Sequence, residues 1–174
     1  FLLTILAAGL LAALLVIFAA LVTLPSLPSL NTLTDYRPKI PLRIYSADGL
    51  LIGEFGEERR DFVKIKDVPE SLKQAILAAE DDRFYQHYGV DYIGVLRAIY
   101  SNFTAGSTLQ GASTITMQVA RNFFLTKEKT FTRKFSEALL AFKIEHNLGK
   151  DRILELYINQ IYLGQRSYGF ATAA

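Results

Sequence analysis

The chain of 174 residues contains no cysteine. It therefore has neither disulfide bonds nor thiolate metal ligands. The absence of cysteine fits a protein that faces an oxidising compartment without disulfides, but it is weak evidence. It also lacks internal repeats and low-complexity tracts, so repeat architectures are excluded. The length suits one ordinary domain and one additional segment.

Residues 1–24 lack charged side chains altogether. At about 1.5 Å per residue, a helix of this length crosses a hydrocarbon core of roughly 30 Å with some tilt. A signal peptide is the alternative, but the apolar run is longer than the hydrophobic region of such a peptide. We therefore predict a transmembrane helix over 1–24. No basic flank precedes Phe1, so the sequence alone does not give its orientation.

The net charge of +2 hides an asymmetry. Residues 43–91 hold 7 basic and 11 acidic side chains, whereas residues 121–152 hold 8 basic and 4 acidic ones. A basic half near a membrane anchor favours an anionic ligand or anionic lipid head groups. Solvated helix faces would give the same counts, so charge alone does not decide between the two interpretations.

Residues 25–66 are predicted to form a linker that contains a β-hairpin. Prolines and serines at 25–29 indicate a short semi-rigid segment, and 31–41 are expected to continue as an extended or irregular connection. Alternating apolar residues flank Asp48-Gly49, which is a strong hairpin signal. A third short strand is expected at 62–65.

Residues 67–174 carry a helical pattern and are predicted to form the main domain. Asp67 is expected to cap a first helix that has Pro69 in its first turn. Further helices are expected at four places: 92–103, 113–122, 130–148 and 150–163. Gly149 and Gly164 are the expected stops of the last two. The predicted fold class is therefore mainly α, with a small β-hairpin element.

Three consecutive carboxylates, Glu80, Asp81 and Asp82, stand at the predicted end of the first helix. Acids at a helix C-terminus cost a few tenths to about 1 kcal/mol each, and these also repel one another. Such a breach of a local rule is typical of a functional site. Crowding and partial burial raise a carboxyl pKa, which suits a general base near neutral pH. A solvated helix end is the plain alternative, and His87 by itself suggests a structural residue near the turn at Gly89.

A glycine and small hydroxyl residues follow a polar loop expected at 106–111 and open the next helix. Free backbone N–H groups and the helix dipole make such a start an anion site. Thr114, Gln118 and Arg121 fall at i, i+4 and i+7, so they share one face of the helix. An ordinary capped helix with a solvated side is the alternative.

A third candidate is the cluster of Arg133, Lys134 and Glu137. Arg133 and Glu137 are i, i+4 partners, and the plain interpretation is a surface ion pair of small energetic consequence. The functional interpretation is a carboxylate beside two cations that hold a phosphate, directly or through a divalent metal. Together, the three candidates supply a base for an acceptor hydroxyl and cations for a leaving pyrophosphate.

Four segments resemble the motifs of the family 51 glycosyltransferases, in the family's order and close to its spacing: 80–89, 111–122, 133–137 and 150–164. The resemblance implies a lysozyme-like helical fold with a membrane-embedded jaw. It implies lipid II as the substrate, a growing β-1,4-linked glycan strand as the product, inversion at the donor sugar and release of undecaprenyl pyrophosphate. It also implies a single-pass protein of the bacterial cytoplasmic (inner) membrane, with its catalytic domain on the outer, periplasmic face.

By position, the resemblance implies catalytic roles for two carboxylates. Glu80 is the expected general base that deprotonates the acceptor 4-hydroxyl. Glu137 is the expected second carboxylate at the pyrophosphate side, with a divalent cation such as Mg²⁺ or Mn²⁺ left open. The expected substrate-binding residues are Asp81, Phe84, His87, Ser113, Thr114, Gln118, Arg121, Asn122, Arg133 and Lys134. Met117 stands where many members have glutamine, a departure expected to be minor.

Residues 44–49 and 57–60 resemble the class A penicillin-binding proteins of the 1A type, which carry a downstream transpeptidase domain. This chain has no Ser-x-x-Lys nucleophile motif, so we expect a fragment of a bifunctional cell-wall enzyme, with its glycosyltransferase domain truncated at the C-terminal end. A monofunctional glycosyltransferase, a lysozyme-like lytic enzyme and a non-catalytic membrane scaffold are the alternatives. Other cell-wall synthesis proteins are expected partners, and nucleic acid is not.

Overall fold

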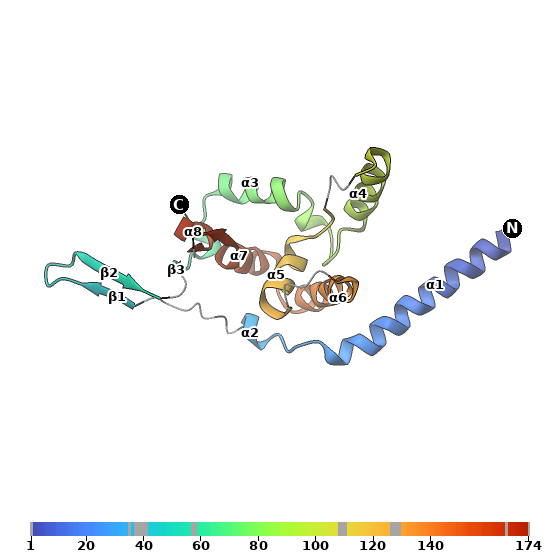
Figure 1. The fold of residues 1–174 in the computed structure, drawn as a ribbon, viewed down its shortest axis with the longest axis horizontal. Coiled ribbons are helices and arrows are strands. Elements are labelled where there is room, and N and C mark those ends of the chain that lie inside the picture. The colour runs from blue at the N-terminus through green and yellow to red at the C-terminus, as the bar shows by residue number, and fades with distance from the viewer. Residues whose placement is uncertain are drawn as a thin grey trace.

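The computed structural model describes residues 2–34, 36, 42–56, 59–107, 111–125, 130–165 and 167–173. Figure 1 shows a long N-terminal helix, a projecting hairpin and a helical domain between them. The helices of the domain are α3 (Glu70–Glu80), α4 (Tyr92–Ala105), α5 (Ile115–Phe124), α6 (Phe131–Asn147), α7 (Lys150–Gln160) and α8 (Phe170–Ala173). The mainly α fold class with a small hairpin is thus confirmed.

The N-terminal helix α1 (Leu2–Thr23) buries none of its residues against the rest of the protein. Together with the 3-10 turn Leu24–Ser26, it forms an apolar segment with a mean hydropathy of 3.0. A helix that is apolar on every side and has no protein partner has the composition of a membrane span.

The connection after α1 differs from the prediction for 31–41, because α2 (Asn31–Thr34) is helical. Leu30 and Leu33 are buried in the hydrophobic core of the domain. A helical turn places residues three apart on one side, which lets both leucines reach the core. Lys143 of α6 also donates a hydrogen bond to the carbonyl of Pro28 at 2.9 Å. Residues 35 and 37–41 lie outside the described residues.

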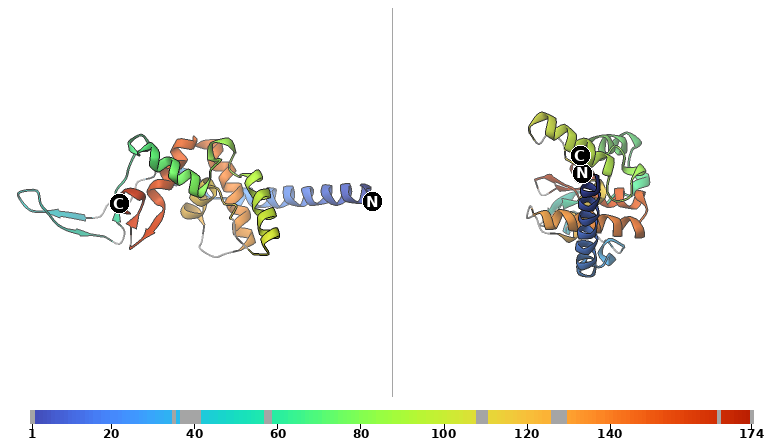
Figure 2. Two further views of the ribbon diagram at one scale, coloured as in Figure 1. Left: turned by 90° about the horizontal axis from the view of Figure 1, so that it is seen from above. Right: turned by 90° about the vertical axis from the view of Figure 1, so that its right-hand side faces the viewer.

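The predicted hairpin is confirmed as β1 (Leu42–Tyr45) paired antiparallel with β2 (Leu51–Phe55). Gly49 has φ +84° in the connecting turn, a conformation that glycine adopts without strain. Figures 1 and 2 place the hairpin at the end of the domain opposite to α1.

The strand predicted at 62–65 is wrong. A small sheet is instead formed by β3 (Arg59–Arg60), β5 (Ser167–Tyr168) and β4 (Tyr162–Gly164), in the order β3-β5-β4. The last predicted helix is correspondingly too long, because α7 ends at Gln160 and the chain enters β4. The apolar pattern that favoured a longer helix also fits a short strand, and pairing with β5 decides between them.

The segment before α3 is held by side chains of α7 rather than by a neighbouring strand. The N–H of Val63 donates to Asn159 Oδ1 and Asn159 Nδ2 donates to the Val63 carbonyl, both at 2.8 Å. The N–H of Ile65 donates to Glu155 Oε2, also at 2.8 Å. An amide side chain therefore replaces the strand partner that the backbone of Val63 would otherwise need.

The prediction that Asp67 caps the first helix is also wrong. Asp67 ends a 3-10 turn (Ile65–Asp67), Val68 is extended, and α3 begins at Glu70 after Pro69. The helical conformation is disfavoured for a residue that precedes proline, so Val68 cannot belong to a helix capped at Asp67.

The helices α5, α6 and α7 form the centre of the domain. Threonine caps fix two of their starts: Thr114 Oγ1 accepts from Met117 N, and Thr130 Oγ1 accepts from Arg133 N, both at 3.1 Å. Every residue of α7 from 153 to 159 is buried. Compared with these helices as the structure has them, the predicted starts and ends of α4, α5 and α6 are correct to within about two residues.

Candidate active site

The carboxylate of Glu80 lies at the C-terminal end of α3 and is exposed to solvent. Its Oε2 accepts a hydrogen bond from Gln118 Nε2 of α5 at 2.8 Å. A neutral amide orients the carboxylate without adding a positive charge beside it. Glu80 thus remains available to accept a proton from a group that approaches from solvent.

Asp81, the next residue, is buried and faces the start of α5. Its Oδ1 lies 3.0 Å from His87 Nε2, and its Oδ2 accepts from the N–H of Ile115 at 3.0 Å. The expectation of a free anion site at the start of α5 is therefore wrong: Asp81 occupies the N–H of Ile115, and Thr114 occupies that of Met117. The protein supplies its own anion at this helix start.

Asp82 is exposed, and its carboxylate lies 3.5 Å from the guanidinium of Arg97 on α4. The three adjacent acids therefore point into three environments, each with a partner of its own. The expected mutual crowding of the three charges is relieved in this way. Glu80, Asp82 and Arg97 line a pocket that is completed by Asp81, Asp91, Gly94, Gly111, Ala112, Ser113 and Thr114.

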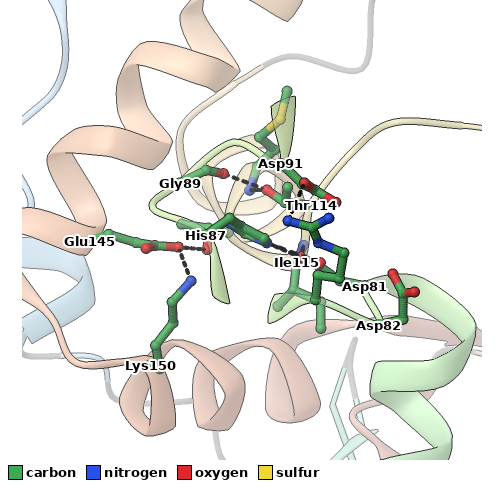
Figure 3. A network of polar contacts seen from close by, with 12 residues as sticks. Asp81, Asp82, His87, Gly89, Asp91, Thr114, Ile115, Glu145 and Lys150 are labelled. Atoms are coloured by element: carbon green, nitrogen blue, oxygen red, sulfur yellow. Dashed lines mark hydrogen bonds and ion pairs between the residues drawn. The ribbon is translucent and has the colours of Figure 1, made fainter. Parts of the chain in front are cut away.

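Figure 3 shows the polar network to which Asp81, Asp91 and Thr114 of this pocket belong. His87 and Phe84 are both buried, and the ammonium of Lys150 lies 4.3 Å from the centre of the Phe84 ring. Glu145 accepts hydrogen bonds from Lys150 at 2.7 Å and from Thr116 at 2.6 Å. The contact between His87 and Asp81 suits a structural role for His87, whereas substrate contact by His87 and Phe84 stays a prediction.

Thr114 is likewise buried, and its hydroxyl donates to the carbonyl of Gly89 at 2.7 Å. Gly89 has φ +74°, and a Cβ there would lie 2.9 Å from the backbone nitrogen of Phe142 on α6. Glycine is required at this position both by conformation and by space. The turn at Gly89, which is bonded to Thr114 of the pocket lining, therefore packs directly against the backbone of α6.

The second cluster surrounds Glu137, whose side chain has an exposed fraction of 0%. Oε1 is paired with Arg133 Nη1, and Oε2 accepts from Lys134 Nζ at 2.8 Å. Lys134 Nζ also donates to Ser113 Oγ at 2.6 Å. The lysine side chain is 42% exposed, so the cluster presents a positive group to solvent while its carboxylate stays covered.

Ser113 joins the two clusters. It lines the pocket that contains Glu80, and its hydroxyl contacts Lys134 of the second cluster. The two glutamates therefore lie near the same end of α5 and not on opposite sides of the molecule. Glu80 lines the polar pocket, and the cation pair is connected to the wall of that pocket through Ser113.

Arg121 and Asn122 lie further along α5. Arg121 is close enough to Tyr157 for its charge to lower the pKa of that phenol, although burial raises the pKa more strongly. Asn122 is exposed. Their contact with a substrate stays a prediction.

The residues of the second cluster fit an anion better than a metal held by protein ligands. Both oxygens of Glu137 are already paired with cations. Within the described ranges, no three histidine, aspartate or glutamate side chains gather at one point. The divalent cation stays a prediction, and no step is derived through it.

Asp91, Gly94 and Arg97 line the pocket but were missed in the sequence. Asp91 pairs with Arg83 at 3.7 Å, and its Oδ2 would lie 2.4 Å from a Cβ added at Gly94. The available signal was an aspartate directly before a helix start, which is an N-cap pattern. That pattern alone did not show that the side chain faces a pocket.

Comparison with known proteins places the chain in a family. The family model described as Transglycosylase matches residues 48–174. The chain is 66% identical over 160 residues to penicillin-binding protein 1A of Neisseria cinerea, covering 92% of this chain and 20% of the relative. It is 53% identical over 150 residues to penicillin-binding protein 1A of Pseudomonas aeruginosa, covering 86% of this chain and 18% of the relative.

The chain belongs to the transglycosylase family. Its mostly helical domain is therefore lysozyme-like, as the four motifs implied. The chain spans about a fifth of the length of the curated relatives that it matches.

Proposed function

We propose that the protein is a peptidoglycan glycosyltransferase that polymerises lipid II into β-1,4-linked glycan strands. In this reaction the acceptor 4-hydroxyl attacks C1 of the donor sugar from the face opposite the diphosphate. The new C1–O4 bond forms, the bond from C1 to the diphosphate breaks, and the configuration at C1 inverts. The hydroxyl proton passes to the base, and undecaprenyl pyrophosphate leaves.

One observation carries this proposal: an exposed carboxylate and a buried, cation-paired carboxylate flank the same end of α5. Among the described residues, Glu80 is bonded by the neutral side chain of Gln118, and it is the proposed base. Arg133 and Lys134 are the proposed groups that stabilise the charge developing on the diphosphate. Glu137 would hold both cations in place, because its two oxygens already bind one each.

The membrane placement rests on two apolar surfaces. Nothing in the described structure covers α1, and α4 exposes a row of large apolar side chains. That row consists of Tyr92, Ile93, Leu96, Ile99, Tyr100 and Phe103. In Figures 1 and 2, α4 lies at the end of the domain from which α1 extends. We propose that α1 spans the inner membrane once, that α4 dips into its outer leaflet, and that the domain lies on the periplasmic face.

We also propose that this chain is the N-terminal part of a bifunctional class A enzyme. The support is that relatives named penicillin-binding protein 1A are about five times as long as the matched segment. The growing glycan strand is the proposed second substrate, and other cell-wall synthesis proteins are the proposed partners.

The decisive experiment incubates the purified full-length protein in detergent with labelled lipid II and, separately, with purified sacculi. Polymer formed from lipid II, without release of soluble fragments from sacculi, is the expected result. Release from sacculi without polymer formation would identify a lytic enzyme instead. Binding of lipid II without turnover would identify a scaffold, and both of these outcomes contradict the proposal.

A further inference from the structure

A second pocket lies beside α3 and shares no lining residue with the pocket at Glu80. Its volume is about 280 Å³. Pockets that hold small molecules begin at roughly 300 Å³, so this one suits a small group or the end of a larger ligand. The lining consists of Ile65, Lys66, Glu70, Lys73, Leu77, Tyr85 and Asp151.

The unused hydrogen-bonding capacity of this pocket belongs to its two ammonium groups. Asp151 accepts from the Tyr85 hydroxyl at 2.9 Å, and Glu70 accepts from Lys73 Nζ at 3.1 Å. An ammonium has three donors, so Lys73 keeps donors to spare. Lys66 is exposed, and no described residue is bonded to its side chain. Both acids are engaged while both lysines can still donate, which favours an anionic ligand.

The charge balance of the lining selects a singly charged anion. Two lysines face two carboxylates, so the net charge of the lining is zero. The desolvation cost of a ligand rises with the square of its charge, whereas its attraction to the lysines rises only in proportion to the charge. A carboxylate is therefore favoured over a doubly charged phosphate. Ile65 and Leu77 add an apolar part, which suits a carboxylate on a carbon chain, as at the end of a peptide.

This pocket lies along the face of α3 that ends at Glu80. Residues 70, 73, 77 and 80 have the spacing i, i+3, i+7 and i+10, which keeps side chains on one face of a helix. At about 1.5 Å per residue, Lys73 and Glu80 are about 10 Å apart along the axis, which is comparable to the length of one disaccharide. Figure 1 shows α3 running from the hairpin side of the domain towards α4. The pocket is therefore farther than Glu80 from the proposed membrane side, which disfavours a lipid head group as its ligand.

We propose that this pocket binds a free carboxylate of the peptide that the disaccharide of the substrate carries, with Lys66 and Lys73 as the binding groups. This inference rests on the proposed function, in which lipid II is the substrate. A sugar unit at Glu80 can extend its peptide along the same face of α3. The site takes no part in bond formation, so it should lower KM without raising kcat.

The test titrates the full-length protein in detergent with two soluble disaccharide–peptide fragments. One fragment has free peptide carboxylates, and in the other they are converted to amides. We expect the wild type to bind the free form about 10-fold more tightly, which corresponds to one charge-assisted contact. Lys66→Gln should remove most of this preference and raise KM for lipid II by a similar factor, with kcat unchanged. Its melting temperature should match the wild type, because the side chain is exposed.

Lys64→Gln is the matched control, because Lys64 is exposed, carries the same charge and lies outside the pocket lining. We expect it to keep the full preference for the free carboxylates. An equal loss in Lys64→Gln and Lys66→Gln would show a general effect of surface charge and overturn the proposal. Equal binding of the two fragments by the wild type would also overturn it. Displacement of the fragment by inorganic phosphate at a similar concentration would identify an unselective anion site and refute the assignment to a carboxylate.

The binding measurement needs no turnover, so it separates this inference from the proposed function. If the wild type polymerises lipid II but shows no preference between the fragments, only the role of this pocket is refuted. If the wild type fails to polymerise lipid II but shows a preference that depends on Lys66, the proposed function fails and the carboxylate site stands.

Discussion

Glu80 and Glu137 carry the same side chain in opposite environments. Glu80 is exposed and has a neutral amide as its partner. Glu137 is fully buried and is paired with two cations. A carboxylate that serves as a base must be reachable and free of tightly bound positive charge, whereas one that holds cations must be covered. The environments therefore divide the two roles more clearly than the residue types do.

The largest expected effect is on activity, at the exposed carboxylate. Glu80→Gln should reduce lipid II polymerisation by about 10²- to 10⁴-fold, the usual contribution of a positioned general base. The melting temperature should not change, because the Glu80 side chain is solvated and Gln118 can bond to the new amide. Product formation is measured by chromatography of labelled glycan. Activity within a few-fold of wild type would contradict the assignment of Glu80 as the base and of different roles to the two glutamates.

The next effect is on stability, at the buried carboxylate. Glu137→Ala leaves Arg133 and Lys134 without their shared partner and should lower the free energy of unfolding by about 2 kcal/mol. We expect less than the 3–5 kcal/mol typical of a broken buried pair, because the lysine side chain is 42% exposed and can turn into solvent. Denaturant unfolding measures this difference, with Glu80→Gln as the matched control. Equal free energies of unfolding for the two variants would contradict the structural role assigned to Glu137 alone.

A smaller effect is expected on the binding of the donor substrate, at Arg133 of the cation cluster. Arg133→Ala should weaken binding of the donor lipid by about 10-fold, which corresponds to one lost charge-assisted contact with the diphosphate. Binding of an acceptor glycan that lacks the diphosphate should be unaffected. Titration of the two ligands separately provides the measurement. An equal loss for both ligands would remove the pyrophosphate role of this cluster.

The smallest effect is expected at Tyr85, outside both clusters. Its hydroxyl donates to Asp151 Oδ1 at 2.9 Å. Burial, followed by the bond to Asp151, raises the pKa of Tyr85 from 10.0 to about 12. The folded state thus keeps a proton that the unfolded state loses, and the free energy of unfolding falls as pH rises from about 10 to 12.

Tyr85→Phe should therefore make this alkaline loss of stability shallower, without any change in polymerisation at neutral pH. Part of the loss should remain, because the pKa of Tyr157 is also raised. Urea unfolding at several alkaline pH values gives the slope. A slope identical to that of the wild type would refute the contribution of Tyr85.

Some groups of the candidate site were predicted from the sequence, and others were not. The motifs identified Glu80, Gln118 and the cation cluster, and the structure brings these groups to one end of α5. The expected anion site at the α5 start was wrong because Asp81, 34 residues earlier in the chain, fills it.

The sequence by itself determined the features that depend on near neighbours. These are the uncharged run of α1, the Asp48-Gly49 hairpin, and the positions of α4, α5 and α6, because turns, caps and hydrophobic periods act over a few residues. Only the tertiary structure decided the strand at 162–164, the helical turn at 31–34 and the separation of the three adjacent acids. Each of these depends on a partner distant in the sequence, which local propensity does not encode.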